Sequence, residues 1–223
     1  MKKINAFLFL LPFIISSCNN AGKTTERVLP IYGEREVNQT TVNGNEVIDT
    51  IFHVAPPFRY LNQDSTWIDQ NLVKDKVYIV DFFFTSCPTI CPKMTSQLKR
   101  VQAKTKDISN LYHIFSFSID PDRDTPQQLR AYIQKNGLTM NNWDMLTGDE
   151  AATHKLGVEG FIVHAGRDED AQGGFAHSAS LVLVDRAGLI RGIYNGTETA
   201  DVDRLEKDLR KLLKVEYGEN IGE

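Results

Sequence analysis

The fold is decided by residues 76–92, which read Lys76-Val-Tyr-Ile-Val-Asp-Phe-Phe-Phe-Thr-Ser-Cys87-Pro-Thr-Ile-Cys91-Pro92. The first nine residues are an almost unbroken run of β-branched and aromatic side chains, which is typical of a central strand covered on both faces. The chain then reaches two cysteines. Residues 93–106 repeat apolar side chains at helical spacing. The sequence therefore predicts a strand, a cysteine loop and a helix in immediate succession.

The segment that follows continues this alternation of strands and helices. Residues 112–119 form a second apolar strand. Thr125 provides an N-cap and Pro126 the first position of a helix that runs through Gln134 and ends at Gly137. The order βαβα is typical of parallel strands joined by helical crossovers.

The C-terminal part predicts a hairpin and a last helix. Residues 180–184 and 189–194 flank the turn sequence Asp185-Arg-Ala-Gly, so we expect them to pair antiparallel. Residues 202–213 have the pattern of an amphipathic helix. The full order, βαβαββα, is that of an α/β thioredoxin-like fold, in which helices flank a central mixed sheet.

Two hairpins are expected before the central strand. The dipeptide Asn43-Gly44 separates two short strand-like stretches, which predicts a small hairpin. Residues 56–60 and 65–68 form a second pair around a turn-forming polar cluster. The thioredoxin-like domain is therefore expected to carry an N-terminal β-hairpin extension.

The first residues resemble an export signal. Lys2 and Lys3 precede an apolar run, residues 6–15, that is too short to span a bilayer as a mature helix. Cys18 follows an apolar-small-small triplet, which resembles the lipobox at which bacterial lipoproteins are cleaved and acylated. We expect Cys18 to carry lipid; the alternative is an ordinary signal peptide with a chance cysteine.

These features divide the chain into four parts. We expect a lipoprotein signal peptide in residues 1–17, a polar tether with the small hairpin in residues 18–50, the thioredoxin-like domain in residues 51–216 and a C-terminal tail in residues 217–223. Cleavage before Cys18 removes two lysines and no acid, so the formal charge moves from −4 to −6. An acidic chain makes nucleic acid an improbable partner.

Cysteine usage limits the chemistry. The chain has three cysteines, so acylation of Cys18 leaves Cys87 and Cys91 and excludes a scaffold of several disulfides. At the start of a helix these two lie one turn apart on one face, where they can form a disulfide or hold one ion. The helix start favours thiolates. Two thiolates suit Cu(I) or zinc, but a structural zinc site normally has four protein ligands.

A third ligand would come from the histidines. His177 stands out because it follows a Gly-Gly-Phe-Ala sequence and directly precedes the strand expected at Ser180. We interpret residues 161–174, charged and Gly-rich, as a mobile loop before it, with a merely solvated insertion as the alternative. His164 stays undecided, and surface or hydrogen-bonded roles are the default for the other three, His53, His113 and His154.

Three blocks together resemble the Sco/SenC family of cytochrome c oxidase assembly proteins over about residues 53–214. The blocks are Phe82-Phe-Phe-Thr-Ser-Cys87-Pro-Thr-Ile-Cys91-Pro, Ser118-Ile-Asp120-Pro-Asp-Arg-Asp124-Thr-Pro126 and Phe175-Ala-His177-Ser178. The resemblance implies a thioredoxin fold that binds one copper ion, Cu(I) or Cu(II), through the matched Cys87, Cys91 and His177. Asp120 matches an acidic position near the metal loop, where it could orient a ligand or the partner; a turn role is an equal alternative.

The resemblance also implies partners and a place in the cell. A family member delivers copper to the dinuclear copper site of oxidase subunit II, or reduces its thiols, and a copper donor protein is a possible second partner. Many relatives are held by a transmembrane helix, whereas the lipobox here implies an exported bacterial lipoprotein, anchored in the membrane through Cys18 and facing the periplasm or the cell exterior.

Two other functions remain open. The first is a general exported thiol-disulfide oxidoreductase, in which Cys87 or Cys91 attacks a target disulfide and the other cysteine resolves the mixed disulfide. It would be an enzyme, whereas a metallochaperone need not turn over, and only metal binding requires His177. A peroxidase-like role ranks third, because the threonine expected several residues before a peroxidatic cysteine is absent.

Overall fold

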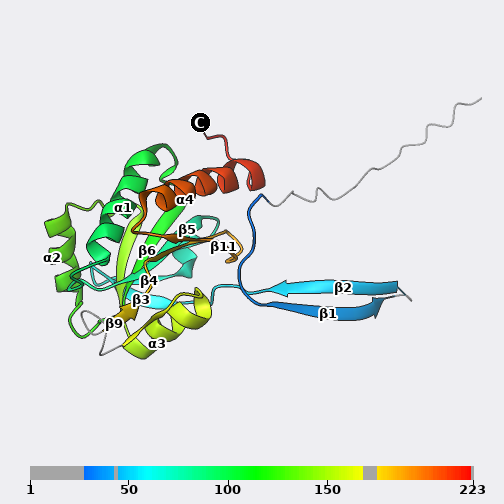
Figure 1. Ribbon diagram of the computed structural model, residues 1–223, viewed down its shortest axis with the longest axis horizontal. Coiled ribbons are helices and arrows are strands. Elements are labelled where there is room, and N and C mark those ends of the chain that lie inside the picture. The colour runs from blue at the N-terminus through cyan, green and yellow to red at the C-terminus, as the bar shows by residue number, and fades with distance from the viewer. Residues whose placement is uncertain (1–27, 43–44, 168–174, 222–223) are drawn as a thin grey trace, which may run out of the picture.

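The computed structural model describes residues 28–42, 45–167 and 175–221 (Figure 1). The expected signal peptide, Cys18 and residues 168–174 of the expected loop lie outside the described residues. A seven-stranded mixed sheet with the order β11-β10-β5-β6-β7-β3-β4 forms the centre. The α/β prediction with helices around a mixed sheet is therefore confirmed.

The described residues contain eleven strands, four α-helices and four short helical turns. The strands are β1 Arg35–Val42, β2 Asn45–Phe52, β3 Arg59–Asn62, β4 Trp67–Asp69, β5 Val77–Phe83, β6 Tyr112–Ser118, β7 Trp143–Thr147, β8 Ala165–Arg167, β9 Phe175–His177, β10 Ser180–Val184 and β11 Ile190–Asn195. The helices are α1 Cys91–Lys104, α2 Pro126–Asn136, α3 Glu150–Lys155 and α4 Thr199–Lys211, with short turns η1 Gln70–Val73, η2 Lys106–Ile108, η3 Leu156–Gly160 and η4 Leu212–Glu216.

Strand β5 is the buried centre of the sheet. All seven of its residues are buried, and it pairs parallel with β6 and antiparallel with β10. Covered on both faces, it needs the continuous β-branched and aromatic run seen in the sequence. Its register places Phe83 beside Ser118, so the chain leaves β5 and β6 at the same edge of the sheet.

Three helices, α2, α1 and α4, lie side by side over one face of this sheet, and α3 lies across the other (Figure 1). Side chains link α1 to both neighbours: Thr95 bonds Tyr132 of α2, and Arg100 pairs with Asp203 of α4. On the opposite face, Phe82 and Phe117 stack, and Phe161 packs against both rings. The site described below lies on the three-helix side.

The structure contains elements that the sequence interpretation missed or misjudged. Strand β7 pairs parallel with β6 and is fully buried, so the order βαβαββα lacked a strand and the following helix α3. The expected loop over residues 161–174 is also wrong at its start. Phe161 and Val163 are buried in the core, and β8 pairs with β9. Apolar side chains at both positions explain why this stretch packs.

The N-terminal extension is larger than the small hairpin expected. Strands β1 and β2 have eight residues each, and this hairpin extends away from the sheet (Figure 1). Before it, Leu29 and Ile31 are buried, and Tyr32 bridges to Ile190 of β11. Residues 28–32 thus pack on the domain. Among the described residues, no helix has the length and apolar character needed to cross a membrane.

Candidate metal centre

Cys87 and Cys91 meet at the start of α1. Cys91 is the first residue of this helix, and Cys87 lies in the loop that joins it to β5. The backbone N–H of Cys91 donates to the Sγ atom of Cys87 at 3.5 Å, and both side chains are buried. The two sulfurs therefore lie close together within the protein, as the spacing in the sequence predicts.

The surroundings of the sulfurs are unfavourable to two negative charges. The pKa of Cys91 is raised, first because it hydrogen bonds with Cys87, then because it is buried and lies near the charge of Asp81. The expectation that the helix start favours a thiolate is therefore wrong for Cys91. The helix N–H instead points at Cys87. A soft cation placed between the sulfurs would replace the shared proton, so the donor pair fits copper.

Polar groups surround the sulfurs on the same face of the sheet. Asp81 of β5 is buried and accepts a hydrogen bond from Ser116. Tyr132 of α2 bonds Thr95 at 2.9 Å; burial, together with the charges of the cysteines and Asp81, raises the pKa of Tyr132 to about 12. Asp81 was missed in the sequence, although a lone acid within an apolar strand is a usable signal.

Asp124 holds the beginning of the cysteine loop. Its carboxylate, fully buried, accepts hydrogen bonds from the N–H of Thr85 at 3.0 Å, the hydroxyl of Thr85 at 2.5 Å and the hydroxyl of Ser118 at 2.6 Å. Burial raises its pKa, although these hydrogen bonds act in the opposite direction. The sequence block from Ser118 to Pro126 includes Asp124, but the sequence predicted no role for it. The geometry makes it the link between the ends of β5 and β6.

Asp120 has the contacts of a turn residue. Its carboxylate pairs with Arg123 at 3.0 Å, and its carbonyl oxygen accepts hydrogen bonds from the N–H groups of Arg123 and Asp124. It is buried, so this ion pair lies partly out of solvent. These are the contacts of the turn role, one of the two alternatives expected for Asp120.

The backbone of His177 lies in β9, paired with Ala165, and its side chain is outside the described part of the structure. The chain after it contacts Gly196, which lies beside the start of α1. The carbonyl of Ala179 accepts the N–H of Gly196 at 2.6 Å, and a Cβ built on Gly196 would lie 3.1 Å both from that oxygen and from Cγ of Met94. His177 is thus two residues from Ala179, and the hydrogen-bond partner of Ala179, Gly196, lies against the helix turn of Cys91.

No further acid, cysteine or histidine among the described side chains completes a cluster of three that could hold a metal. The three histidines for which a surface or hydrogen-bonded role was the default have hydrogen-bonded rings. Nε2 of His113 bonds Asp144 at 2.9 Å, Nε2 of His53 bonds the carbonyl of Gly160 at 2.9 Å, and His154 bonds that of Ile119 at 3.3 Å. His164 is exposed, and its carbonyl accepts the N–H of Ser178.

The sequence model of the SCO1/SenC family matches residues 49–214. This chain belongs to that family. The match includes Cys87, Cys91 and His177, and the predicted resemblance is confirmed. The thioredoxin-like expectation agrees with the solved structures of the family, which share this fold.

Three solved structures show what this chain is similar to. A SCO1/SenC family lipoprotein from Bacillus anthracis is 31% identical, with a TM-score of 0.66 over 72% of this chain and 95% of that one. BsSco, described as a member of the Sco family of cytochrome c oxidase assembly proteins with a disulfide switch, is 32% identical, with a TM-score of 0.64 over 71% and 92%. Arabidopsis thaliana ScoI, solved with copper bound, is 25% identical, with a TM-score of 0.59 over 72% and 98%.

Proposed function

We propose that this protein binds one copper ion through Cys87, Cys91 and His177 and uses it to assemble the dinuclear copper site of cytochrome c oxidase subunit II. The observation that carries the proposal is the pair of buried sulfurs at the start of α1, with Cys91 N–H 3.5 Å from Cys87 Sγ. Two sulfurs and an imidazole form a soft donor set suited to Cu(I). Family members are oxidase assembly proteins, and one binds copper.

Copper here is cargo, so the site must both hold and release it. The protein's part is to keep the two sulfurs close and shielded from water while the third ligand comes from a separate segment. The β8–β9 pair has three residues in each strand. A third ligand on so short an element can leave without unfolding the domain, which suits ligand exchange with acceptor thiols.

The test is metal binding by the reduced protein with copper and zinc offered in competition. We expect one copper ion per chain and exclusion of zinc. His177→Ala should abolish stoichiometric copper binding, while His164→Ala, at an exposed neighbouring histidine, should leave it unchanged. Preference for zinc, or one-to-one copper binding by His177→Ala, would refute the site.

Thiol-disulfide exchange is a second candidate function, favoured by the hydrogen bond between Cys87 and Cys91. The thiolate of one cysteine would attack a target disulfide, and the second would displace the reduced target, leaving a Cys87–Cys91 disulfide. His177→Ala should spare this reaction, and Cys91→Ser should stop it at the mixed disulfide if Cys87 attacks first. An unchanged rate of target reduction in the double variant Cys87→Ser, Cys91→Ser would exclude this role.

We further propose that Cys18 carries the lipid that anchors the exported protein in the membrane. A similar family member is itself a lipoprotein. Cys18→Ala should move the protein from the membrane fraction to the soluble fraction. Retention of the variant in membranes would contradict a lipid anchor at this residue.

A further inference from the structure

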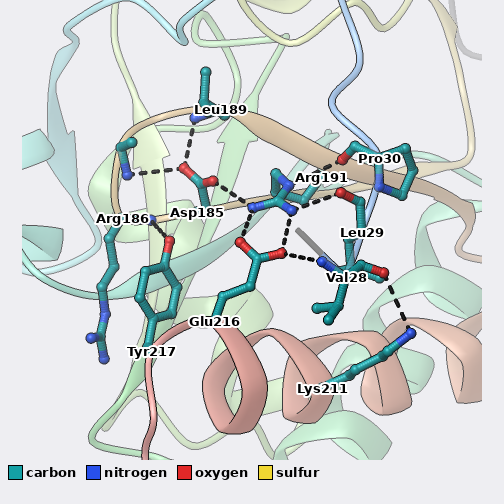
Figure 2. Close-up of polar contacts among 11 residues, drawn as sticks. Val28, Leu29, Pro30, Asp185, Arg186, Leu189, Arg191, Lys211, Glu216 and Tyr217 are labelled. Carbon is teal, nitrogen blue, oxygen red and sulfur yellow. Dashed lines mark hydrogen bonds and ion pairs between the residues drawn. The ribbon is translucent and has the colours of Figure 1, made fainter. Parts of the chain in front are cut away.

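Arg191 of β11 fastens the N-terminal segment to the domain (Figure 2). Its guanidinium is 2% exposed and pairs with Asp185 at 2.9 Å and with Glu216 at 2.5 Å. It also donates to the carbonyl oxygens of Leu29 and Pro30, at 2.7 and 3.0 Å. We call this group the Arg191 clasp. It fixes the chain where that chain enters the domain.

The clasp also joins Val28 to the C-terminal end of the last helix. The N–H of Val28 donates to Glu216 at 2.9 Å, and Nζ of Lys211 lies 3.4 Å from the carbonyl oxygen of Val28 (Figure 2). Only residues 19–27 separate Val28 from Cys18. Nine residues span at most about 30 Å. A lipid on Cys18 would thus keep the end of α4 within reach of the bilayer surface.

The exposed side of α4 and η4 is basic beside this entry point. The sheet-facing side of α4 contains the buried residues Val202, Leu205 and Leu209. The opposite, exposed side of α4 and η4 contains three lysines at helical spacing, Lys207, Lys211 and Lys214. We call these three lysines the basic face. Among the described residues, none of them is in an ion pair.

The acids of the same helix are all engaged elsewhere, so they do not neutralise the basic face. Each lies in an ion pair with an arginine or with Lys104 of α1: Asp201 and Asp208 with Arg204, Asp203 with Arg100 and Lys104, Glu206 with Arg210, and Glu216 with Arg191. The neighbouring α1 contains four basic residues and no acid. The three lysines of the basic face are therefore the charges that this helix leaves unpaired on its exposed side among the described residues.

We propose that the basic face lies against the anionic phospholipid headgroups of the membrane that anchors the protein. The proposal rests on the lipid anchor at Cys18 put forward above. The clasp and the short tether let this surface reach the bilayer, and lysines that come within a Debye length of an anionic surface are attracted to it. Val215, 51% exposed beside Lys214, adds an apolar group at the same end. An anionic lipid surface therefore matches both the charge and the position of α4.

The test is lysine acetylation of the full acylated protein in vesicles, read at each lysine by mass spectrometry. Vesicles of phosphatidylcholine alone are compared with vesicles of equal parts phosphatidylcholine and phosphatidylglycerol. With phosphatidylglycerol, labelling of the basic face should slow about fivefold, the factor given by about 1 kcal/mol per lysine. Lys135 and Lys155, exposed on α2 and α3, should be labelled at equal rates in both, and high salt should remove the difference.

A variant pair isolates the electrostatic contribution. Lys207→Gln with Lys214→Gln should remove the protection at Lys211. The control, Lys135→Gln with Lys155→Gln, changes the net charge equally and should keep it. The proposal would be overturned if the wild-type lysines Lys207 and Lys214 were labelled at the same rate in vesicles with and without phosphatidylglycerol, whether that common rate is fast or slow. Failure of the wild type to float with either vesicle would instead refute the lipid anchor, and the orientation with it.

Discussion

The carboxylate of Asp124 accepts the backbone N–H of Thr85 at 3.0 Å, across 39 residues of sequence. This bond joins the turn before α2 to the chain two residues ahead of Cys87. The hydroxyls of Thr85 and Ser118 donate to the same carboxylate. The position of the first sulfur therefore depends on a residue that belongs to a different crossover.

Asp124→Asn should weaken both the fold and the metal site. An amide has one acceptor oxygen where the carboxylate has two, so at least one of the three donors, two from the partly buried Thr85 and one from the buried Ser118, loses its acceptor. The free energy of unfolding should fall by about 2 kcal/mol. Copper affinity should fall with it, because the cysteine loop loses its attachment. Denaturant titration and competitive copper titration measure the two effects.

Asp75→Asn is the matched control for Asp124→Asn. Asp75 is exposed, with φ at 66°, a conformation that asparagine accepts readily. The same chemical change there should alter neither property. Equal behaviour of the two variants would show that the Asp124 contacts do not hold the loop.

Glu216→Gln should release the Arg191 clasp. It leaves a buried guanidinium without one of its two carboxylates, so the free energy of unfolding should fall by about 3 kcal/mol. Amide hydrogen exchange in residues 28–32 should speed up more than exchange in β5. Glu219→Gln, which removes a carboxylate from the less buried pair with Arg186, is the control and should cost under about 1 kcal/mol.

The clasp should also respond to acid. Burial alone would raise the pKa of Glu216, but the hydrogen bonds from Arg191 and the N–H of Val28 outweigh it, so the pKa is lowered. A lowered pKa gives stability that is present above the ordinary value of 4.5 and is lost as pH falls through the lowered value. The stability difference between wild type and Glu216→Gln should shrink over that acid range. A difference independent of pH would contradict an ionised Glu216 in the clasp.

Cys87→Ala should make Cys91 react at lower pH. The largest cause of the raised pKa of Cys91 is its hydrogen bond with Cys87, and burial is the second. Without that partner the pKa falls, although burial still keeps it above the ordinary value. The pH dependence of iodoacetamide alkylation at Cys91, in metal-free protein, measures the shift. Ser86→Ala, at an exposed residue of the same loop, keeps Cys87 and its hydrogen-bond partner Thr89 and should leave the profile unchanged.

Much of the fold could be predicted because its signals are local. Thr125 caps α2 through the N–H of Gln128, and Gly137 ends it in the left-handed conformation with φ at 57°. The apolar run of β5 and the spacing of the two cysteines are equally local. Strand β7 was not predicted because it is short and contains Asp144, a residue type that is common in turns. Hydrogen bonds from His113, Asn62 and Gln63, all distant in sequence, make this acid acceptable in the interior.

The roles of Asp124 and Arg191 could not be predicted, because their partners are also distant in sequence. Asp124 matters because β5 and β6 end together, which depends on the register of the sheet. Arg191 is a single charge within an apolar strand, which signals a buried partner. Its partners, Glu216 and the carbonyl oxygens of Leu29 and Pro30, come from both ends of the chain. Sequence spacing identifies ligands on one element; it does not identify groups that meet through tertiary structure.

Gly196→Ala should disturb the segment that follows His177. A Cβ at this position would lie 2.9 Å from Cγ of Leu181 and 3.1 Å from the carbonyl oxygen of Ala179 and from Cγ of Met94. The added methyl must displace the segment from Ala179 to Leu181 or the side chain of Met94, which costs about 1–3 kcal/mol of stability. Because that segment carries His177, copper affinity should fall in competitive titration. Gly166→Ala is the control, since a Cβ there meets nothing within 4 Å, and it should change neither quantity. A Gly196→Ala protein that is destabilised but binds copper as tightly as wild type would show that the third ligand is positioned independently of this contact.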